Sequence, residues 1–263
     1  MHMMAVVQFR PVRGEVAANL QKLVALAENA LRAGAKLVVL PEMAAVGYRF
    51  SGRDEVRAIA ESLDGRTSRA FSELSARHAA WIVVGLAEAA GSTLYNSAIA
   101  LGPDGRLTAH FRKRLLFIDD LRWAVAGDLP YPAFPTPWGV ATIGICMDLN
   151  DPRFTAAIVR RRFEIVCFPT NWIDEQDPRI HEYWLARLGK WRGTLLAANR
   201  WGEEDGVGFY GRSAILRAGR VEAAAPPSGD GWIAVEPVVP GAARPRRRGA
   251  KSAGRPPALG GRA

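Results

Sequence analysis

Short runs of apolar residues alternate along this chain with longer segments in which apolar residues recur every three or four positions. Residues 4–8 and 36–40 are runs of the first kind, and residues 15–33 between them show the second spacing. Gly34 follows this segment directly, at the position where the C-terminus of a helix favours glycine. The pattern therefore predicts a strand, a helix and a second strand joined by short links, which is a βαβ unit.

The same reading extends through the rest of the chain. Residues 53–63 and 67–79 predict two amphipathic helices, and the turn at 102–105 predicts a hairpin between two strands. Further helices are expected at 156–162 and 181–192, and strands at 81–86, 95–101, 107–111, 139–143, 165–168, 194–198, 209–216 and 232–237. Strands that alternate with helices and then add hairpins predict an α/β domain with helices on the faces of its sheets.

Composition divides the 263 residues into two parts. Residues 241–263 consist mainly of Pro, Gly, Ala and Arg, and they carry seven of the nine net positive charges, which leaves +2 for residues 1–240. Such a segment buries too little apolar surface to offset its chain entropy, so we predict one domain over residues 1–240 and a disordered tail over 241–263. Nucleic acid is an expected partner only through this tail, and a solvated tail without a specific partner is the alternative.

Two cysteines, Cys146 and Cys167, are the only ones in the chain. This number predicts no disulfide framework and favours a reducing compartment. No apolar run reaches the length of a membrane span, and the first residues lack the basic and apolar regions of a signal peptide. We therefore expect a cytoplasmic protein that has no membrane partner.

Three residues of chemical interest follow predicted strands directly. Glu42 follows the strand at 36–40, Lys113 the strand at 107–111, and Cys146 the strand at 139–143. Because catalytic groups gather beyond the carboxyl ends of strands in such sheets, a base, an ammonium and a nucleophilic thiol could meet there. Each residue also has an ordinary interpretation, as a solvated carboxylate, a surface lysine and a buried structural thiol. Cys167, inside an apolar strand, is interpreted as a core residue.

The segments at 40–42, 111–113 and 144–148 resemble, in order and spacing, the three signature segments of the nitrilase superfamily of carbon–nitrogen hydrolases. The likeness extends over most of residues 4–237 and includes the segments at 47–48, 94–97, 169–172, 198–200 and 208–213. It implies a four-layer α-β-β-α sandwich. It also implies a homodimer or higher homo-oligomer, usually paired through the helical face.

This resemblance implies amide or nitrile hydrolysis through a thioester, without a metal or another cofactor. Glu42 would be the general base, Cys146 the nucleophile, and Lys113 with the backbone N–H of Met147 would hold the oxyanion. The residues implied to contact the substrate are Tyr48, Asp120, Asn171 and Trp172. Asp120 stands where many relatives carry a second glutamate, and because an aspartate is one methylene shorter, its functional role stays open at this stage.

The expected substrate is a small-molecule amide or the amino terminus of a peptide. Residues 146–150 and 182–188 resemble the branch of protein N-terminal asparagine/glutamine amidohydrolases, which release ammonia from a primary amide. The acidic loop at 174–177 would attract a protonated α-amino group, although it is equally interpreted as a solvated loop. The alternatives are an aliphatic amidase or ω-amidase, a carbamoylase, a nitrilase, and an inactive binding protein that keeps the fold and binds nucleic acid through its tail.

Overall fold

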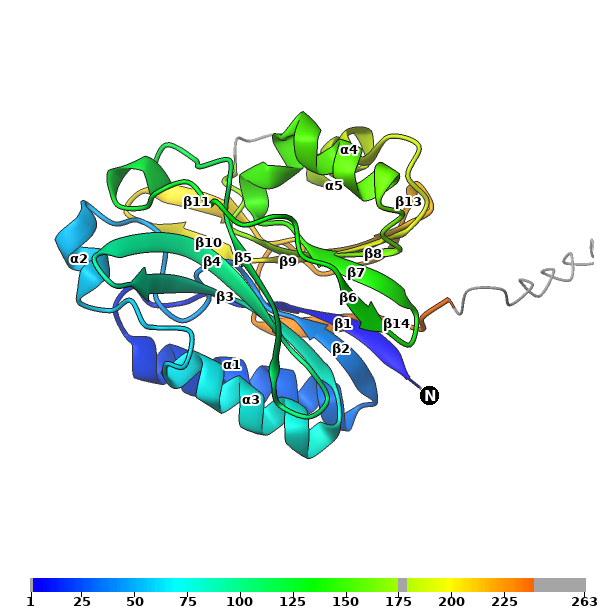
Figure 1. The fold of residues 1–263 in the computed structure, drawn as a ribbon, viewed down its shortest axis with the longest axis horizontal. Coiled ribbons are helices and arrows are strands. Elements are labelled where there is room, and N and C mark those ends of the chain that lie inside the picture. The colour runs from blue at the N-terminus through cyan, green and yellow to red at the C-terminus, as the bar shows by residue number, and fades with distance from the viewer. Residues whose placement is uncertain (1, 175–178, 239–263) are drawn as a thin grey trace, which may run out of the picture.

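The computed structural model describes residues 2–174 and 179–238, which fold into two six-stranded sheets that lie face to face between two layers of helices (Figure 1). The first sheet has the order β14-β1-β2-β3-β4-β5 and contains β1 (Met3–Gln8), β2 (Ala35–Val39), β3 (Trp81–Ala90), β4 (Thr93–Leu101), β5 (Leu107–Arg112) and β14 (Gly231–Val235). The second has the order β13-β12-β9-β8-β7-β6 and contains β6 (Phe134–Thr136), β7 (Gly139–Ile143), β8 (Ile165–Thr170), β9 (Thr194–Asn199), β12 (Ala214–Arg217) and β13 (Arg220–Ala224).

Helices cover the outer face of each sheet. The first sheet is covered by α1 (Val16–Arg32) and α3 (Arg66–His78), the second by α4 (Pro152–Arg160) and α5 (Ile180–Leu188), as Figure 1 shows. The short helix α2 (Arg53–Arg57) and the two-stranded sheet of β10 (Trp201–Glu204) and β11 (Val207–Tyr210) complete the α/β architecture. The expected four-layer α-β-β-α sandwich is confirmed. Within the described residues, no helix is both long and apolar enough to cross a membrane.

The strands of the first sheet are apolar on both faces because each face is covered. On β1, Met4 and Val6 belong to the core between the two sheets, whereas Ala5 and Val7 pack on the side of α1 and α3. Successive side chains of a strand point to opposite faces, so a strand buried on both sides is an uninterrupted apolar run. This is why the short apolar runs at 4–8 and 36–40 were readable as strands.

The direction of the strands brings three ends together. β1, β2 and β3 are mutually parallel, as are β7, β8 and β9. β5 also runs in the direction of β2, because two antiparallel pairings, β3 with β4 and β4 with β5, lie between them. The residues that leave β2, β5 and β7 are therefore Glu42, Lys113 and Cys146, each within three positions of its strand end.

Several predicted elements differ in extent from the observed ones, such as the helix predicted over 181–192, which ends at Leu188, and two of them differ most. The helix predicted over 53–63 ends at Arg57, and Glu61 instead forms a β-bridge with Glu88. The strand predicted over 209–216 is two strands, because the chain turns at Gly211 and Arg212, whose φ angles are 59° and 48°. A Cβ at position 211 would lie 2.1 Å from a carbonyl oxygen, so this turn requires glycine. The strands β6, β10 and β13 were not predicted.

Gly85 on β3 lets the segment that carries Glu42 lie directly against the strand. Its N–H donates to the carbonyl of Pro41 (3.2 Å), and its carbonyl accepts from the N–H of Ala44 (3.2 Å). A Cβ at position 85 would lie 2.6 Å from the Cα of Glu42 and 2.7 Å from the carbonyl oxygen of Pro41. Both neighbours are backbone atoms, so no side chain could move aside.

A buried carboxylate, Glu88 on β3, fixes the end of β5 against the middle of the sheet. It accepts hydrogen bonds from Ser97 (2.5 Å) and Arg112 (2.6 Å) and lies 2.8 Å from Nε2 of His110. Burial by itself raises the pKa of Glu88, but the hydrogen bonds from His110, Arg112 and Ser97 lower it to about 2. Because Arg112 directly precedes Lys113, this ionic cluster sets the position at which Lys113 leaves the strand.

We predict that Gly85→Ala destabilises the protein by about 1–3 kcal/mol, because the added methyl group must displace backbone. Urea unfolding measures this loss. The matched control is Gly52→Ala, since a Cβ there meets no atom within 4 Å and φ is an extended 179°. Equal stabilities of the two variants would contradict the close approach of β3 to the Glu42 segment.

We predict that Glu88→Gln makes the free energy of unfolding depend less steeply on pH in the acid range. Because folding lowers the pKa of Glu88, its ionised carboxylate stabilises the folded protein above about pH 4.5. This stabilisation is lost as the pH falls towards about 2 and the carboxylate takes up a proton. The difference in unfolding free energy between the wild type and Glu88→Gln should therefore shrink by about 2 kcal/mol from about pH 6 to about pH 3. Denaturant titrations at several pH values measure it, with Glu73→Gln on the exposed face of α3 as the control. A constant difference would show that Glu88 does not titrate as described.

Candidate active site

The structure brings Glu42, Lys113 and Asp120 into contact in the interior. The Nζ of Lys113 lies 2.6 Å from Oε1 of Glu42 and 2.6 Å from Oδ2 of Asp120, and all three side chains are fully buried. Asn96 on β4 bridges the two carboxylates, because its Nδ2 donates to Oε1 of Glu42 (2.7 Å) and to Oδ1 of Asp120 (3.0 Å). The open question about Asp120 is thereby answered in terms of position: the shorter side chain still reaches the ammonium.

The electrostatics of this cluster favour a charged lysine and a basic glutamate. Burial raises the pKa of Glu42, the nearby carboxylate of Asp120 raises it further, and Lys113 opposes both effects. Burial alone would lower the pKa of Lys113, but Asp120 and Glu42 raise it well above its usual value. The second oxygen of Glu42, Oε2, has no hydrogen-bond partner among the described residues. Glu42 therefore has a carboxylate oxygen that can exchange a proton.

Cys146 lies at the first position of the short 3-10 helix η2 (Cys146–Asn150), in a sharp turn after β7. Its φ is 45°, a left-handed conformation that is uncommon for a residue other than glycine. Strained backbone of this kind clusters at functional sites, where the surrounding structure must hold it. Directly before the turn, Gly144 is packed against the ring of Phe154, and a Cβ at that glycine would lie 2.3 Å from the ring.

Asp148 holds the turn of Cys146 to the segment that follows Lys113. Its Oδ2 accepts from the N–H of Ile145 (3.0 Å), and its Oδ1 accepts from the N–H groups of Arg114 (3.0 Å) and Leu115 (2.9 Å). Burial raises the pKa of Asp148 to about 7, although these N–H groups act in the opposite direction. One side chain thus fixes the two segments relative to each other.

The thiol of Cys146 is neutral at rest. Burial raises its pKa to about 12, and the carboxylate of Glu42 adds to this effect. Lys113, the side chain of Thr170 and the backbone N–H of Asn171 favour the thiolate instead. Since the neutral thiol is a weak nucleophile, reaction at this sulfur requires a base and a stabilising cation beside it, and Glu42 and Lys113 both act electrostatically on the thiol.

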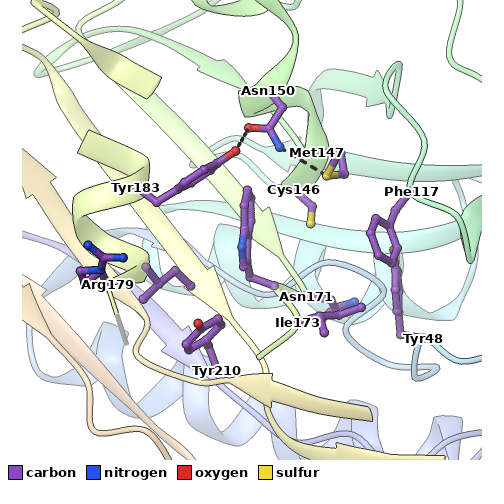
Figure 2. Close-up of a pocket in the computed structure, with 12 residues that line it drawn as sticks. Tyr48, Phe117, Cys146, Met147, Asn150, Asn171, Ile173, Arg179, Tyr183 and Tyr210 are labelled. Atoms are coloured by element: carbon purple, nitrogen blue, oxygen red, sulfur yellow. Dashed lines mark hydrogen bonds between the residues drawn. The ribbon is translucent and has the colours of Figure 1, made fainter. Parts of the chain in front are cut away.

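A pocket of about 230 Å³ opens above Cys146 (Figure 2). In Figure 2, Tyr48 and Phe117 lie on one side of Cys146, and Tyr183 and Arg179 lie on the other. Tyr183 donates a hydrogen bond to Oδ1 of Asn150 (2.7 Å) across the pocket wall. The lining residues are Tyr48, Phe117, Cys146, Met147, Asn150, Asn171, Trp172, Ile173, Arg179, Ile180, Tyr183 and Tyr210.

Most of the residues expected at the site are found there. Tyr48, Met147, Asn171 and Trp172 line the pocket, whereas Asp120 lies beneath it against Lys113. Cys167 is a buried residue of β8 in the core, as expected. Of the acidic loop, only Asp174 belongs to the described residues; positions 175–177 lie outside them, so its proposed role at the pocket rim stays a prediction.

Several residues of the buried cluster and of the pocket wall were given no role by sequence reasoning. Asn96 was part of the resemblance without a role, and only the fold shows that it joins two carboxylates. Phe117, Asn150 and Tyr183 were also missed, because a place in the pocket depends on how α5 and the segment after Lys113 are oriented. Across residues 2–174 and 179–238, no cluster of three His, Cys, Asp or Glu side chains could hold a metal ion.

Comparison with known proteins agrees with this geometry. The family model for carbon-nitrogen hydrolase matches residues 3–236. The chain is 32% identical over 212 residues to a nitrilase from Pyrococcus abyssi. This alignment covers 80% of this chain and 79% of the relative. It is 27% identical over 254 residues to the protein N-terminal amidase of Schizosaccharomyces pombe, with 80% and 89% covered.

A solved structure of an N-terminal amidase with an Asn-Glu-Ala peptide has the same fold. It matches with a TM-score of 0.77 at 15% identity, over 89% of this chain and 97% of that one. Together with the family match over nearly all described residues, the fold and the relatives lead to one assignment. The chain belongs to the carbon-nitrogen hydrolase family and is a hydrolase of the nitrilase superfamily.

Proposed function

We propose that this chain hydrolyses a primary amide and releases ammonia, with Cys146 as the nucleophile, Glu42 as the general base and Lys113 as the electrostatic stabiliser. The observation that carries the proposal is the contact of the Lys113 ammonium with Glu42 (2.6 Å), two buried groups that both act electrostatically on the thiol of Cys146 in the pocket wall. A base, a cation and a thiol in one buried cluster are the groups that acyl transfer to sulfur requires.

In the first half of the reaction, Glu42 accepts the thiol proton while the sulfur of Cys146 attacks the amide carbon. The negative charge that develops on the carbonyl oxygen is stabilised by the ammonium of Lys113 and the backbone N–H of Met147. Glu42 then returns the proton to the amide nitrogen, the C–N bond breaks, and ammonia leaves. The product of this half is a thioester on Cys146.

In the second half, Glu42 removes a proton from a water molecule, and the resulting hydroxide attacks the thioester carbon. The C–S bond breaks, the acid leaves, and the sulfur recovers its proton from Glu42. Asp120 keeps Lys113 charged and in place throughout, since its carboxylate contacts the ammonium at 2.6 Å and raises its pKa. Asn96 fixes the distance between the two carboxylates by donating to both.

The leading substrate in this proposal is an asparagine or glutamine residue at the amino terminus of a peptide. The relative in Schizosaccharomyces pombe is a protein N-terminal amidase, and the solved N-terminal amidase of the same fold holds an Asn-Glu-Ala peptide. The pocket of this chain supports the same class, because Trp172 and Tyr183, whose ring centroids lie 5.5 Å apart, both line it and aromatic rings attract a protonated α-amino group.

A nitrile is the second candidate substrate, favoured by the 32% identity to the nitrilase of Pyrococcus abyssi. The same sulfur would then attack a nitrile carbon, and hydrolysis would again release ammonia. Aliphatic amides, ω-amides and carbamoylated amines are further alternatives at the same site. A panel of these compounds, scored by ammonia release, separates the classes.

The homodimer implied by the family resemblance also stays a proposal. The layer formed by α4 and α5 is the surface that would pair, and it exposes apolar side chains, among them Val159 with 60% of its surface accessible. Because Tyr183 of α5 also lines the pocket, pairing through this layer would lie close to the site.

We predict that Cys146→Ala and Cys146→Ser lower amide hydrolysis by at least about a thousandfold while the fold is kept, because only the nucleophile is lost. Ammonia release measures turnover, and circular dichroism measures folding. An electrophilic amide analogue should label Cys146 and leave Cys167 unlabelled; the matched control is Cys167→Ala, which should keep its turnover. Preferential labelling of Cys167, or no labelling at all, would favour the binding protein, whereas full activity of Cys146→Ala would show that another residue is the nucleophile.

We predict that N-acetylation of an Asn-initiated peptide lowers kcat/KM at least about tenfold, because it removes the positive charge that the aromatic faces attract. The three substrates to compare are the free peptide, its N-acetylated form and a simple aliphatic amide. If acetylation leaves kcat/KM unchanged, the amino group is not recognised, and the chain is better described as a general amidase.

A further inference from the structure

Thr170 ends β8 directly beside the turn of Cys146. β7 and β8 are parallel neighbours in which Ile143 pairs with Cys167, and the N–H of Gly144 donates to the carbonyl of Cys167 (3.1 Å). From this pair, each chain runs three residues further, to Cys146 on one side and to Thr170 on the other. The register of the two strands therefore places the threonine next to the nucleophilic sulfur.

The hydroxyl of Thr170 is buried and unused in the resting structure. The residue is fully buried, and its Oγ1 has no partner that meets hydrogen-bond geometry among the described residues. Buried hydroxyl groups are rarely left without a partner, because an unmade hydrogen bond costs about 1–3 kcal/mol. Thr170 does lie close enough to the Cys146 sulfur to favour its thiolate form. The hydroxyl is thus available beside the sulfur, an atom whose charge changes during the reaction.

The sulfur needs such a donor. Burial and the carboxylate of Glu42 both disfavour a negative charge on Cys146. The ammonium of Lys113 favours that charge, but it is already held between two carboxylates at 2.6 Å each. A donor that is not engaged elsewhere adds stabilisation that Lys113 alone does not supply.

We propose that Thr170 is a further catalytic residue, whose hydroxyl donates a hydrogen bond to the Cys146 sulfur whenever that sulfur is negatively charged. The charge is present as the thiol proton leaves for Glu42 and again as the thioester breaks. Because the proposed hydrogen bond ends on the sulfur, Thr170 acts on the nucleophile and not on the substrate. This inference rests on the proposed role of Cys146 as the nucleophile.

The test uses Thr170→Val, which keeps the shape of the side chain and removes the hydroxyl, and Thr170→Ser, which keeps the hydroxyl. Thr67→Val is the matched control, since Thr67 is 1% exposed and its Oγ1 also has no partner among the described residues, but it lies at the start of α3. Thr170→Ala provides a second hydroxyl-free variant in case the valine does not fold.

The readout is the rate at which iodoacetamide alkylates Cys146, identified by mass spectrometry of the modified peptide and followed against pH, together with kcat and KM. A hydrogen bond to a charged group contributes about 1.5–3 kcal/mol, which corresponds to a tenfold to hundredfold change. We expect alkylation at neutral pH and kcat to fall by about tenfold or more in Thr170→Val, with KM unchanged. Thr170→Ser and Thr67→Val should stay within about threefold of the wild type.

Three outcomes would overturn the proposal: wild-type alkylation and kcat in Thr170→Val, an effect on KM alone, or a Thr170→Ser variant as slow as Thr170→Val. The last result would show that the hydroxyl does not preserve the rate, and would assign the effect to the packing of the side chain. Alkylation does not depend on which amide is the natural substrate, so a wrong substrate assignment leaves this test intact. A wrong nucleophile would be visible separately, as a Cys146→Ala variant that retains activity.

Discussion

The buried ammonium of Lys113, held between the carboxylates of Glu42 and Asp120, is the interaction on which the rest of the site depends. Removing three charges from water costs several kcal/mol for each ion, and the attraction between them repays that cost only when the geometry is close and the remaining polar atoms are satisfied. The two distances of 2.6 Å meet the first condition, and Asn96 satisfies one oxygen of each carboxylate, whereas Oε2 of Glu42 keeps no partner among the described residues. The cluster carries more negative than positive charge, which keeps Lys113 protonated and leaves Glu42 basic.

The fold supplies this geometry through backbone contacts more than through side chains. β2, β5 and β7 deliver their ends to one edge, Gly85 lets β3 approach the Glu42 segment, and Glu88 holds the end of β5. The layers of helices cover the outer faces of both sheets, so the strands are buried on both sides and consist of apolar residues. Burial of both faces also defines the register of the strands. The site is therefore built on rigid strands, while the pocket walls come from the turns and from α5.

Sequence patterns predicted the strands that are apolar on both faces, because burial imposes an uninterrupted run such as that at 36–40. They also predicted the three strand-end residues, since each directly follows such a run. The break at Gly211 could not be predicted, because it depends on contact with a carbonyl of a distant segment. Nor could the roles of Asn96 and Tyr183, whose partners lie far away in the sequence and meet them only in the folded chain.

The bonds of Asp148 join two turns that are more than thirty residues apart in the sequence. The N–H groups of Ile145, Arg114 and Leu115 share one carboxylate, so neither turn can open without breaking bonds that also hold the other. The two turns therefore belong to one cooperative unit of local unfolding, and their amide hydrogens exchange with solvent in a common event. Phe117 of the pocket wall follows Leu115 by two residues. A ligand that binds against Phe117 therefore also stabilises the turn of Cys146 against opening.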